Sequence, residues 1–238
     1  MLLQQGEELF TTIADEIDDE SCQQRARTVA RVQLTLATDG TATGEIEEEF
    51  HGREAVRWRA LLARTPEDER MGMFEEDYVA DVLPGAEVTE LEIQNESTLG
   101  EALIVTYRIS SLRLGESPAE GTLRLLLPYQ SELASGFASL PSRQTALVIH
   151  APQDETISFE IRLPDGATAQ LPPPVQAIDP RGEYRLTAPA EQPPGTILLE
   201  RHISLHPGRV EPSRYATWSS FCRTVDRSEQ QPITVRLR

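Results

Sequence analysis

Lysine is missing from this sequence of 238 residues, and all 22 of its basic residues are arginine. We interpret that bias as one of genome composition, although arginine and lysine are not interchangeable in a site. The acidic residues number 39, so the formal net charge is −17 at pH 7. A surface with that charge repels nucleic-acid phosphates and anionic lipid head groups. We therefore expect neither nucleic acid nor an anionic membrane surface as a partner.

Long apolar runs and aromatic residues are also scarce. No run of 18 apolar residues occurs, so the sequence predicts no membrane-spanning helix. The opening residues, MLLQQGEELFTT, lack the basic region and the apolar stretch of a signal peptide, so they assign no compartment. Aromatic residues make up only 5% of the chain, so the core must be built mainly from valine, leucine, isoleucine and alanine.

Cysteine is limited to two residues, Cys22 and Cys222, near opposite ends of the chain. The sequence leaves open whether they pair, but it holds neither a disulfide framework nor the ligand spacing of a zinc site. It also lacks a P-loop, a dinucleotide-binding glycine pattern and a G-x-S-x-G nucleophile motif. We therefore expect no cofactor and no metal.

Alternation of apolar and polar residues predicts strands through the first half. Val32, Leu34 and Leu36 alternate with polar residues, and Asp39-Gly40 follows as a hairpin turn. The phase of the alternation changes between 88 and 91, which indicates a β-bulge. The predicted elements are a hairpin within 28–50 and strands within 86–94, 103–109 and 123–127.

Between these strands the apolar period changes to that of helices. Ala55, Trp58, Leu61 and Leu62 share one helical face. A second helix is expected from Thr65-Pro66, because threonine can cap it and proline suits its first turn. The insert then ends at Pro84-Gly85.

The second half repeats this style. Short strands are expected within 146–150, 157–163, 184–186, 197–205 and 233–237. The prolines of 172–174 cannot lie inside a sheet, so they are assigned to a loop. An apolar helical stripe predicts one helix at about 213–227.

Turn signals at intervals of roughly ten residues are typical of sandwiches of short antiparallel strands. We therefore predict a mostly-β fold with a few short helices, arranged as an antiparallel β-sandwich in two lobes. The expected division is a lobe at 1–128 with a two-helix insert at about 52–83, a connection at 129–144, and a lobe at 145–238.

The order of landmarks resembles the region that follows the catalytic core in bacterial transglutaminase-like proteins with flanking domains of unknown function. The resemblance extends from Glu7 to Leu237 and rests on short motifs. These are the turn Asp39-Gly40, a helix start with Gly52, Ala55 and Arg59, the residue Arg143, the strand end Leu163-Pro164-Asp165-Gly166, and the group Val210, Pro212 and Tyr215.

The resemblance implies a non-catalytic accessory region, which packs against the core or positions its protein substrate. In that family the chemistry belongs to a Cys-His-Asp core, in which His activates a thiolate. The motifs around that Cys and that His do not occur in this sequence, so no catalytic residue carries over. The resemblance also implies an extracytoplasmic location, which nothing else in the sequence indicates.

Cys222 is the first candidate nucleophile, with His202 and His206 nearby in sequence. It lies on the apolar stripe of the predicted helix, where a cysteine is expected to be an inert core residue. Cys22 follows an acidic segment, 15–20, whose negative charge disfavours a thiolate. We expect neither cysteine to be catalytic.

His202 and His206 are four residues apart, which would suit one metal ion on a helix. The surrounding alternation predicts a strand instead, where four residues span roughly 13 Å. The pair is therefore not expected to chelate one ion. Arg201 falls on the core-facing phase of the same strand, so we expect it to pair with a buried carboxylate; an anion-binding pocket is the alternative.

Two acidic runs, Glu45–Glu49 and Asp15–Glu20, lack the spacing and the glycine of a calcium loop. We expect both to be solvated acidic faces. No catalytic, cofactor or metal residue is therefore assigned.

Three functions remain in view. The first is the accessory region described above, with a transglutaminase-like core in the same or a neighbouring chain as its partner. The second is a free-standing module that binds a peptide or glycan at its sheet edges or at the loop between Pro172 and Pro180. The third is an enzyme that uses Cys222 or an arginine–carboxylate pocket.

Overall fold

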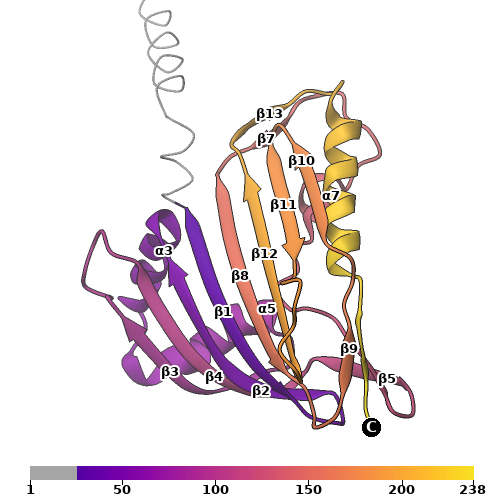
Figure 1. Ribbon diagram of the computed structural model, residues 1–238. Coiled ribbons are helices and arrows are strands. Elements are labelled where there is room, and N and C mark those ends of the chain that lie inside the picture. The colour runs from indigo at the N-terminus through magenta and orange to yellow at the C-terminus, as the bar shows by residue number, and fades with distance from the viewer. Residues whose placement is uncertain (1–25) are drawn as a thin grey trace, which may run out of the picture.

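The structure, a computed structural model, describes residues 26–238. Its largest element is an eight-stranded sheet in the order β10-β11-β12-β8-β1-β2-β4-β3, which Figure 1 shows as one curved layer. Its strands are β1 (Arg27–Leu36), β2 (Thr41–Phe50), β3 (Glu87–Gln94), β4 (Leu103–Arg113), β8 (Gln153–Arg162), β10 (Val175–Asp179), β11 (Gly182–Thr187) and β12 (Thr196–Leu205).

Two smaller sheets lie beside the large one. A four-stranded sheet has the order β5-β6-β14-β9, and β7 pairs with β13 in a two-stranded sheet. Their strands are β5 (Gly115–Ala119), β6 (Thr122–Leu125), β7 (Leu147–Ile149), β9 (Thr168–Gln170), β13 (Gly208–Val210) and β14 (Ile233–Arg236).

The helices form an insert near one end of the large sheet and a long helix near the other (Figure 1). The insert contacts β1, β3 and β4, and α7 lies against β10. Both were expected, at about 52–83 and about 213–227. The helical segments are α3 (Gly52–Leu62), η1 (Glu67–Glu69), α4 (Arg70–Phe74), η2 (Glu75–Val79), α5 (Ala80–Val82), α6 (Leu133–Phe137) and α7 (Tyr215–Glu229). In residues 26–238, no helix is long and apolar enough to cross a membrane.

The predicted mostly-β fold with a few short helices is confirmed, with one difference in the pairing. The named strand pairs of the large sheet are antiparallel except β1 with β8, which run parallel, so the sheet is mixed. A parallel pair requires a long connection between its strands. The connection from β1 to β8 contains the helical insert, β2 to β7 and α6.

The two predicted lobes share their sheets. β1 comes from the first expected lobe and β8 from the second, yet they are neighbours in the large sheet. In the smaller sheet, β14 pairs with β6 and so joins the end of the chain to the first half. The expected division into 1–128 and 145–238 is therefore not a division between sheets, because two strand pairings, β1 with β8 and β6 with β14, cross it.

The hairpin turn at Asp39-Gly40 forms as expected. The amide of Thr41 donates to Asp39 Oδ1 at 2.9 Å and its hydroxyl donates at 2.6 Å. These bonds favour the charged carboxylate and lower the pKa of Asp39. Gly40 has φ +88°, and a Cβ there would lie 2.3 Å from the carbonyl oxygen of Gly115. The turn therefore requires glycine for both its conformation and its contact.

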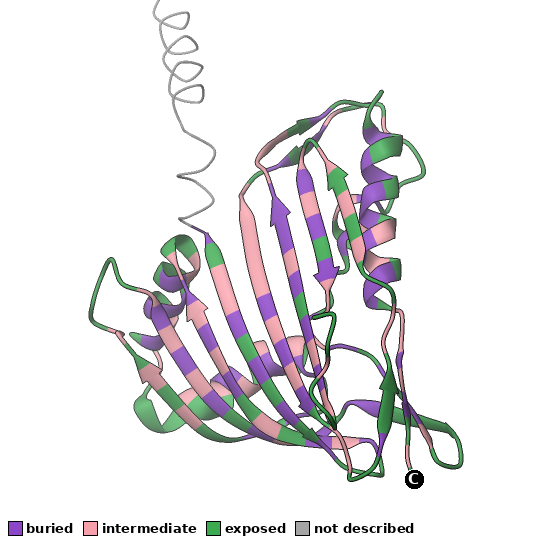
Figure 2. Cartoon of the chain, in the orientation of Figure 1, coloured by how far each residue is buried: buried purple, intermediate pink, exposed green. Residues whose placement is uncertain are grey.

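One contiguous core contains residues from all three sheets and from the helices. Figure 2 shows buried and exposed residues alternating along the strands of the large sheet. We call the buried side the inner face and the opposite side the outer face. The outer face carries paired charges, including Arg108 with Glu45 at 3.0 Å and with Glu90 at 2.9 Å. These charged side chains of the outer face thus have partners within the sheet itself.

Candidate functional site

Cys222 is buried on the side of α7 that faces the protein core. Its exposure is 0%, and it lies among buried residues of the same helix, including Trp218, Phe221 and Val225. Burial disfavours the thiolate and raises the pKa of the Cys222 thiol to about 12. Cys22 lies outside the described residues. The only cysteine with a described environment is therefore a packed core residue.

His202 and His206 lie at the C-terminal end of β12 and just beyond it. His202 lies within β12, where its Nε2 is 3.7 Å from Asp154 Oδ1, and His206 follows the end of that strand. The predicted strand is present at His202, and it ends one residue before His206. In the part of the chain that the structure describes, no group of three or more His, Cys, Asp and Glu side chains could hold a metal ion.

Arg201 forms the buried ion pair that its position in the alternation of the strand predicted. It is 2% exposed on β12, and its guanidinium contacts Glu229 of α7 at 3.0 Å and also Glu155 of β8. Burial lowers the pKa of Arg201, and the charge of Glu229 opposes that effect. The two carboxylates thus supply the opposite charge from within the protein, while Nε of Arg201 is buried without a hydrogen-bond partner.

Glu48 corrects the expectation that the run Glu45–Glu49 is uniformly solvated. Glu45, Glu47 and Glu49 belong to the outer face, but Glu48 has 0% exposure on the inner face. Burial raises the pKa of Glu48, although hydrogen bonds from tyrosines oppose the shift. Its phase was readable from the sequence, because Glu48 lies two residues from Ile46 and two from Phe50, both apolar.

Three tyrosine hydroxyls surround the carboxyl of Glu48. Tyr107 of β4 donates to Oε1 at 2.7 Å, Tyr129 donates to the same oxygen at 2.5 Å, and Tyr78 of η2 donates to Oε2. The hydroxyls of Tyr107 and Tyr129 also lie 2.8 Å apart. We refer to these four side chains as the tyrosine–glutamate cluster.

Glu48 and Arg201 lie in the same transverse row of the sheet. The register places Arg201 opposite Ile157, Ile157 opposite Ala30, and Ala30 opposite Glu48. Residues that face each other across strands point to the same side, and each strand step is about 4.8 Å. The two charged residues are thus three strands apart on the inner face, at roughly 14 Å.

Tyr129 bridges that gap. Its hydroxyl donates to Glu48, and its backbone carbonyl accepts a hydrogen bond from Arg201. Its φ is +62°, a conformation that an aromatic residue rarely adopts. Residues in such conformations persist only where surrounding contacts hold them. Here the contacts come from β2 on one side and β12 on the other.

The segment after Tyr129 is fixed by two acids of α7. Glu229 accepts from the amide of Ser131 at 2.6 Å and from its hydroxyl at 2.8 Å. Asp226 accepts from the amides of Leu133 and Ala134 at 2.8 and 2.9 Å, at the start of α6. The stretch predicted as a plain connection at 129–144 is therefore hydrogen-bonded into the core.

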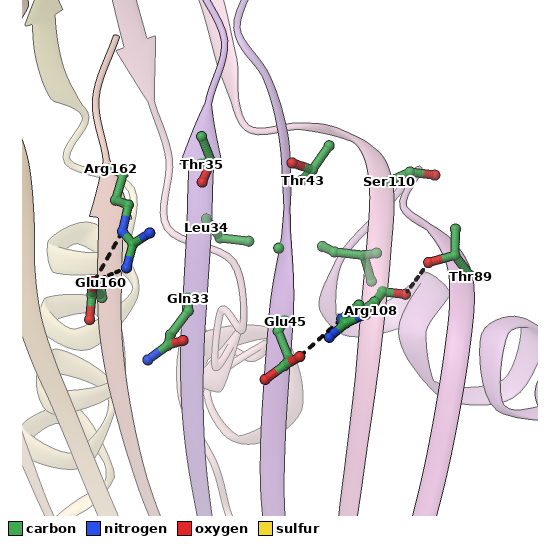
Figure 3. Close-up of a pocket in the computed structure, with 12 residues that line it drawn as sticks. Gln33, Leu34, Thr35, Thr43, Glu45, Thr89, Arg108, Ser110, Glu160 and Arg162 are labelled. Carbon is green, nitrogen blue, oxygen red and sulfur yellow. Dashed lines mark hydrogen bonds and ion pairs between the residues drawn. The ribbon is translucent and has the colours of Figure 1, made fainter. Parts of the chain in front are cut away.

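Three hollows lie on the surface of the described residues. The first, of about 450 Å³, is open and lies on the outer face, where Arg162 pairs with Glu160 and Arg108 with Glu45 (Figure 3). The second, of about 490 Å³, lies between α3 and the start of β8. The third, of about 1070 Å³, lies beside β5 and β6 and includes Tyr129 and Ser131 in its lining. None of the hollows exposes Cys222.

Comparison with known families gives one match. The family described as a domain of unknown function with a solved structure, DUF3858, matches residues 124–235. The match begins in β6, extends through α7 and ends in β14, and it covers a little under half of the 238-residue chain. None of the curated proteins compared matches this chain.

Among solved structures, similarity is found to a crystal structure from Parabacteroides distasonis ATCC 8503 described as "a putative protease". The TM-score is 0.42 and the sequence identity is 18%. The alignment covers 50% of this chain and 24% of that protein, so the aligned half of this chain spans about a quarter of that protein's length.

Proposed function

We propose that this chain is a non-catalytic accessory region that packs against a transglutaminase-like catalytic core, or positions that core's protein substrate. The core would lie in the same or a neighbouring chain. The observation that carries the proposal is the enclosure of Cys222, whose thiol is 0% exposed and has a raised pKa. A thiol nucleophile needs both ionisation and access to its substrate.

The landmarks of the family resemblance support an architectural role, because they occupy structural positions. Asp39-Gly40 forms the hairpin turn, and Arg143 lies over the ring of Tyr215 at 5.7 Å from its centroid. Arg59 of α3 donates hydrogen bonds to four backbone carbonyls in the loop between β3 and β4, those of Asn95, Glu96, Thr98 and Glu101.

The helical insert offers the face for docking. Val56 of α3 is 60% exposed, Met71 of α4 is 44% exposed and Leu99 of the β3–β4 loop is 81% exposed. Arg59 ties α3 to that loop, and Arg70 ties the start of α4 to the same loop through Glu96 at 3.0 Å. Large apolar side chains exposed on elements that are fixed to one another favour a protein partner.

Thiol labelling of the folded protein tests the non-catalytic assignment. We expect Cys222 to react with an aromatic disulfide reagent many times more slowly in the folded protein than in the same protein unfolded by denaturant. Cys22 is replaced by serine in both samples, so that only Cys222 reports. Rapid stoichiometric labelling of the folded protein at neutral pH would contradict the assignment.

Calorimetric titration tests the docking. The purified chain is titrated with the transglutaminase-like core encoded in frame with it or next to it in the source genome. Replacing Val56 and Leu99 with aspartate should weaken binding at least tenfold. The matched control, Ile178→Asp, changes an exposed apolar residue on the distant edge strand β10. Equal binding by all three proteins would exclude the insert as the docking face.

A second candidate is a module that binds an extended peptide along β10. Ile178 is 71% exposed on this edge strand, which follows the proline loop at 172–174. An exposed edge can accept another strand. In that case Ile178→Asp is the variant that loses binding, so the same pair of variants distinguishes the two candidates.

A further inference from the structure

The hydrogen-bond contacts of the tyrosine–glutamate cluster outnumber the protons that its tyrosines can donate. Its four oxygen–oxygen contacts are Tyr78 with Oε2 of Glu48, Tyr107 and Tyr129 each with Oε1, and Tyr107 with Tyr129. Each contact needs one proton between its two oxygens. Three phenols provide three protons, so one proton is missing when Glu48 is ionised.

A proton on Oε1 of Glu48 completes the set. That proton is donated to Tyr107, Tyr107 donates to Tyr129, and Tyr129 donates back to Oε1. The three oxygens then form a closed hydrogen-bond ring in which each donates once and accepts once, while Tyr78 donates to Oε2. Such chains polarise one another and are strengthened by closure.

We propose that Glu48 is a neutral carboxylic acid in the folded protein at neutral pH, and that its hydrogen-bond ring is a pH-sensitive junction between the two halves of the chain. The ring includes β2 and β4 of the first half. Through the carbonyl of Tyr129 it is joined to Arg201 and hence to α7 of the second half.

The burial of the cluster agrees with a neutral carboxyl. Glu48 is 0% exposed, Tyr107 is 1% exposed and Tyr129 is 6% exposed. Desolvation is the largest cause of the raised pKa of Glu48. Burial also raises the pKa of Tyr78, Tyr107 and Tyr129, so the phenols keep the protons that the ring requires.

The neighbouring charges do not compensate a carboxylate at Glu48. Arg201 is the nearest buried cation along the row, and it already contacts two carboxylates. An ionised Glu48 would add a third negative charge to one positive charge in this part of the core. The titratable and charged groups around the carboxyl are Tyr78 from η2, Tyr107 from β4, Tyr129 from the segment after β6, Arg57 from α3, Arg201 from β12, Glu155 from β8 and Glu229 from α7.

The sign of the pH dependence follows from linkage. An unfolded glutamate ionises near pH 4.3, whereas folded Glu48 keeps its proton to higher pH. The folded state therefore binds the extra proton above that value. The stabilisation is complete below the unfolded pKa and is lost as pH rises through the folded pKa. Loss of the proton opens the ring at the contact between Oε1 and Tyr107, next to Tyr129, which lines the third hollow.

Urea unfolding of Glu48→Gln as a function of pH tests the proposal. An amide keeps the size of the side chain but cannot donate and accept through one atom, and it does not titrate. Between pH 5 and 8, the unfolding equilibrium constant of the wild type should rise relative to that of the variant by up to about tenfold per pH unit. The matched control is Glu47→Gln on the same strand, where the side chain is 41% exposed. It should follow the wild type.

A difference between wild type and Glu48→Gln that is constant with pH, or that has the opposite slope, would overturn the proposal. The wild-type protein provides a measurement that does not depend on folding of the variant. In a carbon-13 NMR titration, the Glu48 carboxyl carbon should retain the shift of a protonated acid at pH 7. Titration of that carbon in the ordinary range of glutamate would also overturn the proposal.

Discussion

The hydroxyl of Tyr129 lies 2.5 Å from Oε1 of Glu48 and completes a polar path across the inner face of the large sheet. The same residue accepts from Arg201 through its backbone. Tyr129 is thus held in a left-handed conformation by groups from both halves of the chain.

Removing the Tyr129 hydroxyl should destabilise the protein. Tyr129→Phe removes the hydroxyl that contacts both Oε1 of Glu48 and the hydroxyl of Tyr107 in a buried site, which costs about 1–3 kcal/mol in the free energy of unfolding. Urea unfolding monitored by circular dichroism measures the change. A matched control is Tyr215→Phe, whose hydroxyl bonds one backbone carbonyl, that of Leu140 at 2.9 Å. Equal small losses in both variants would contradict the special position of Tyr129.

Removing the charge of Arg201 should be more costly. Arg201→Met leaves Glu229 buried without its cation, and breaking a buried pair in this way costs about 3–5 kcal/mol. Adding Glu229→Gln should recover part of that loss, because the uncompensated charge disappears. Thermal unfolding of the two single variants and the double variant measures the coupling. Strict additivity would contradict a direct interaction.

Asp226 should control the order of α6. Its carboxylate accepts from two amides at the start of that helix, so Asp226→Asn should weaken the segment by about 1 kcal/mol. Hydrogen exchange at Leu133 and Ala134 should accelerate in the variant, while exchange in the strands stays unchanged. Asp165→Asn, at an exposed turn, is the control. Unchanged protection at Leu133 would show that the carboxylate charge is dispensable.

Arg59 should hold the loop between β3 and β4. Lysine at this position keeps the charge but loses the planar fork that serves four carbonyls. We expect Arg59→Lys to increase proteolytic cleavage within 95–101 several-fold in the native protein. Arg57→Lys changes an exposed arginine on the same helix and should leave cleavage unchanged. Similar cleavage of both variants would refute the role of Arg59.

The raised pKa of Cys222, about 12, predicts a distinctive pH profile for alkylation. The rate in the folded protein should keep rising from pH 7 to pH 10, because the thiolate fraction is still increasing. A cysteine with an ordinary pKa near 8.5 would reach a plateau in that interval. The Cys22→Ser background isolates the measurement, and a plateau reached by pH 10 would contradict the buried environment.

Several parts of the structure could be predicted from the sequence, because they depend on local chemistry. The hairpin at 28–50 forms because alternation and the Asp39-Gly40 turn agree. The bulge in β3 lies between Val88 and Glu90, within the interval where the alternation changed phase. Arg201 lies on the inner face and is paired, as its position between apolar residues indicated.

At Glu48, the alternation of the strand and the local composition pointed in different directions. Its phase placed it between Ile46 and Phe50, but its neighbours in an acidic run suggested solvent. The partners that allow its burial, Tyr107 and Tyr129, are 59 and 81 residues away in sequence. No local pattern identifies such partners, so the cluster could not be assembled from the sequence.

The sequence alone determined which apolar residues of the strands face the core, because that depends only on the two-residue period of a strand and on side-chain polarity. It also determined that Cys222 lies on an apolar helical stripe. The tertiary structure decided the parallel pairing of β1 with β8 and the joining of Glu48 to Arg201 through Tyr129. These depend on contacts between distant segments, whose geometry is set only when the whole sheet forms.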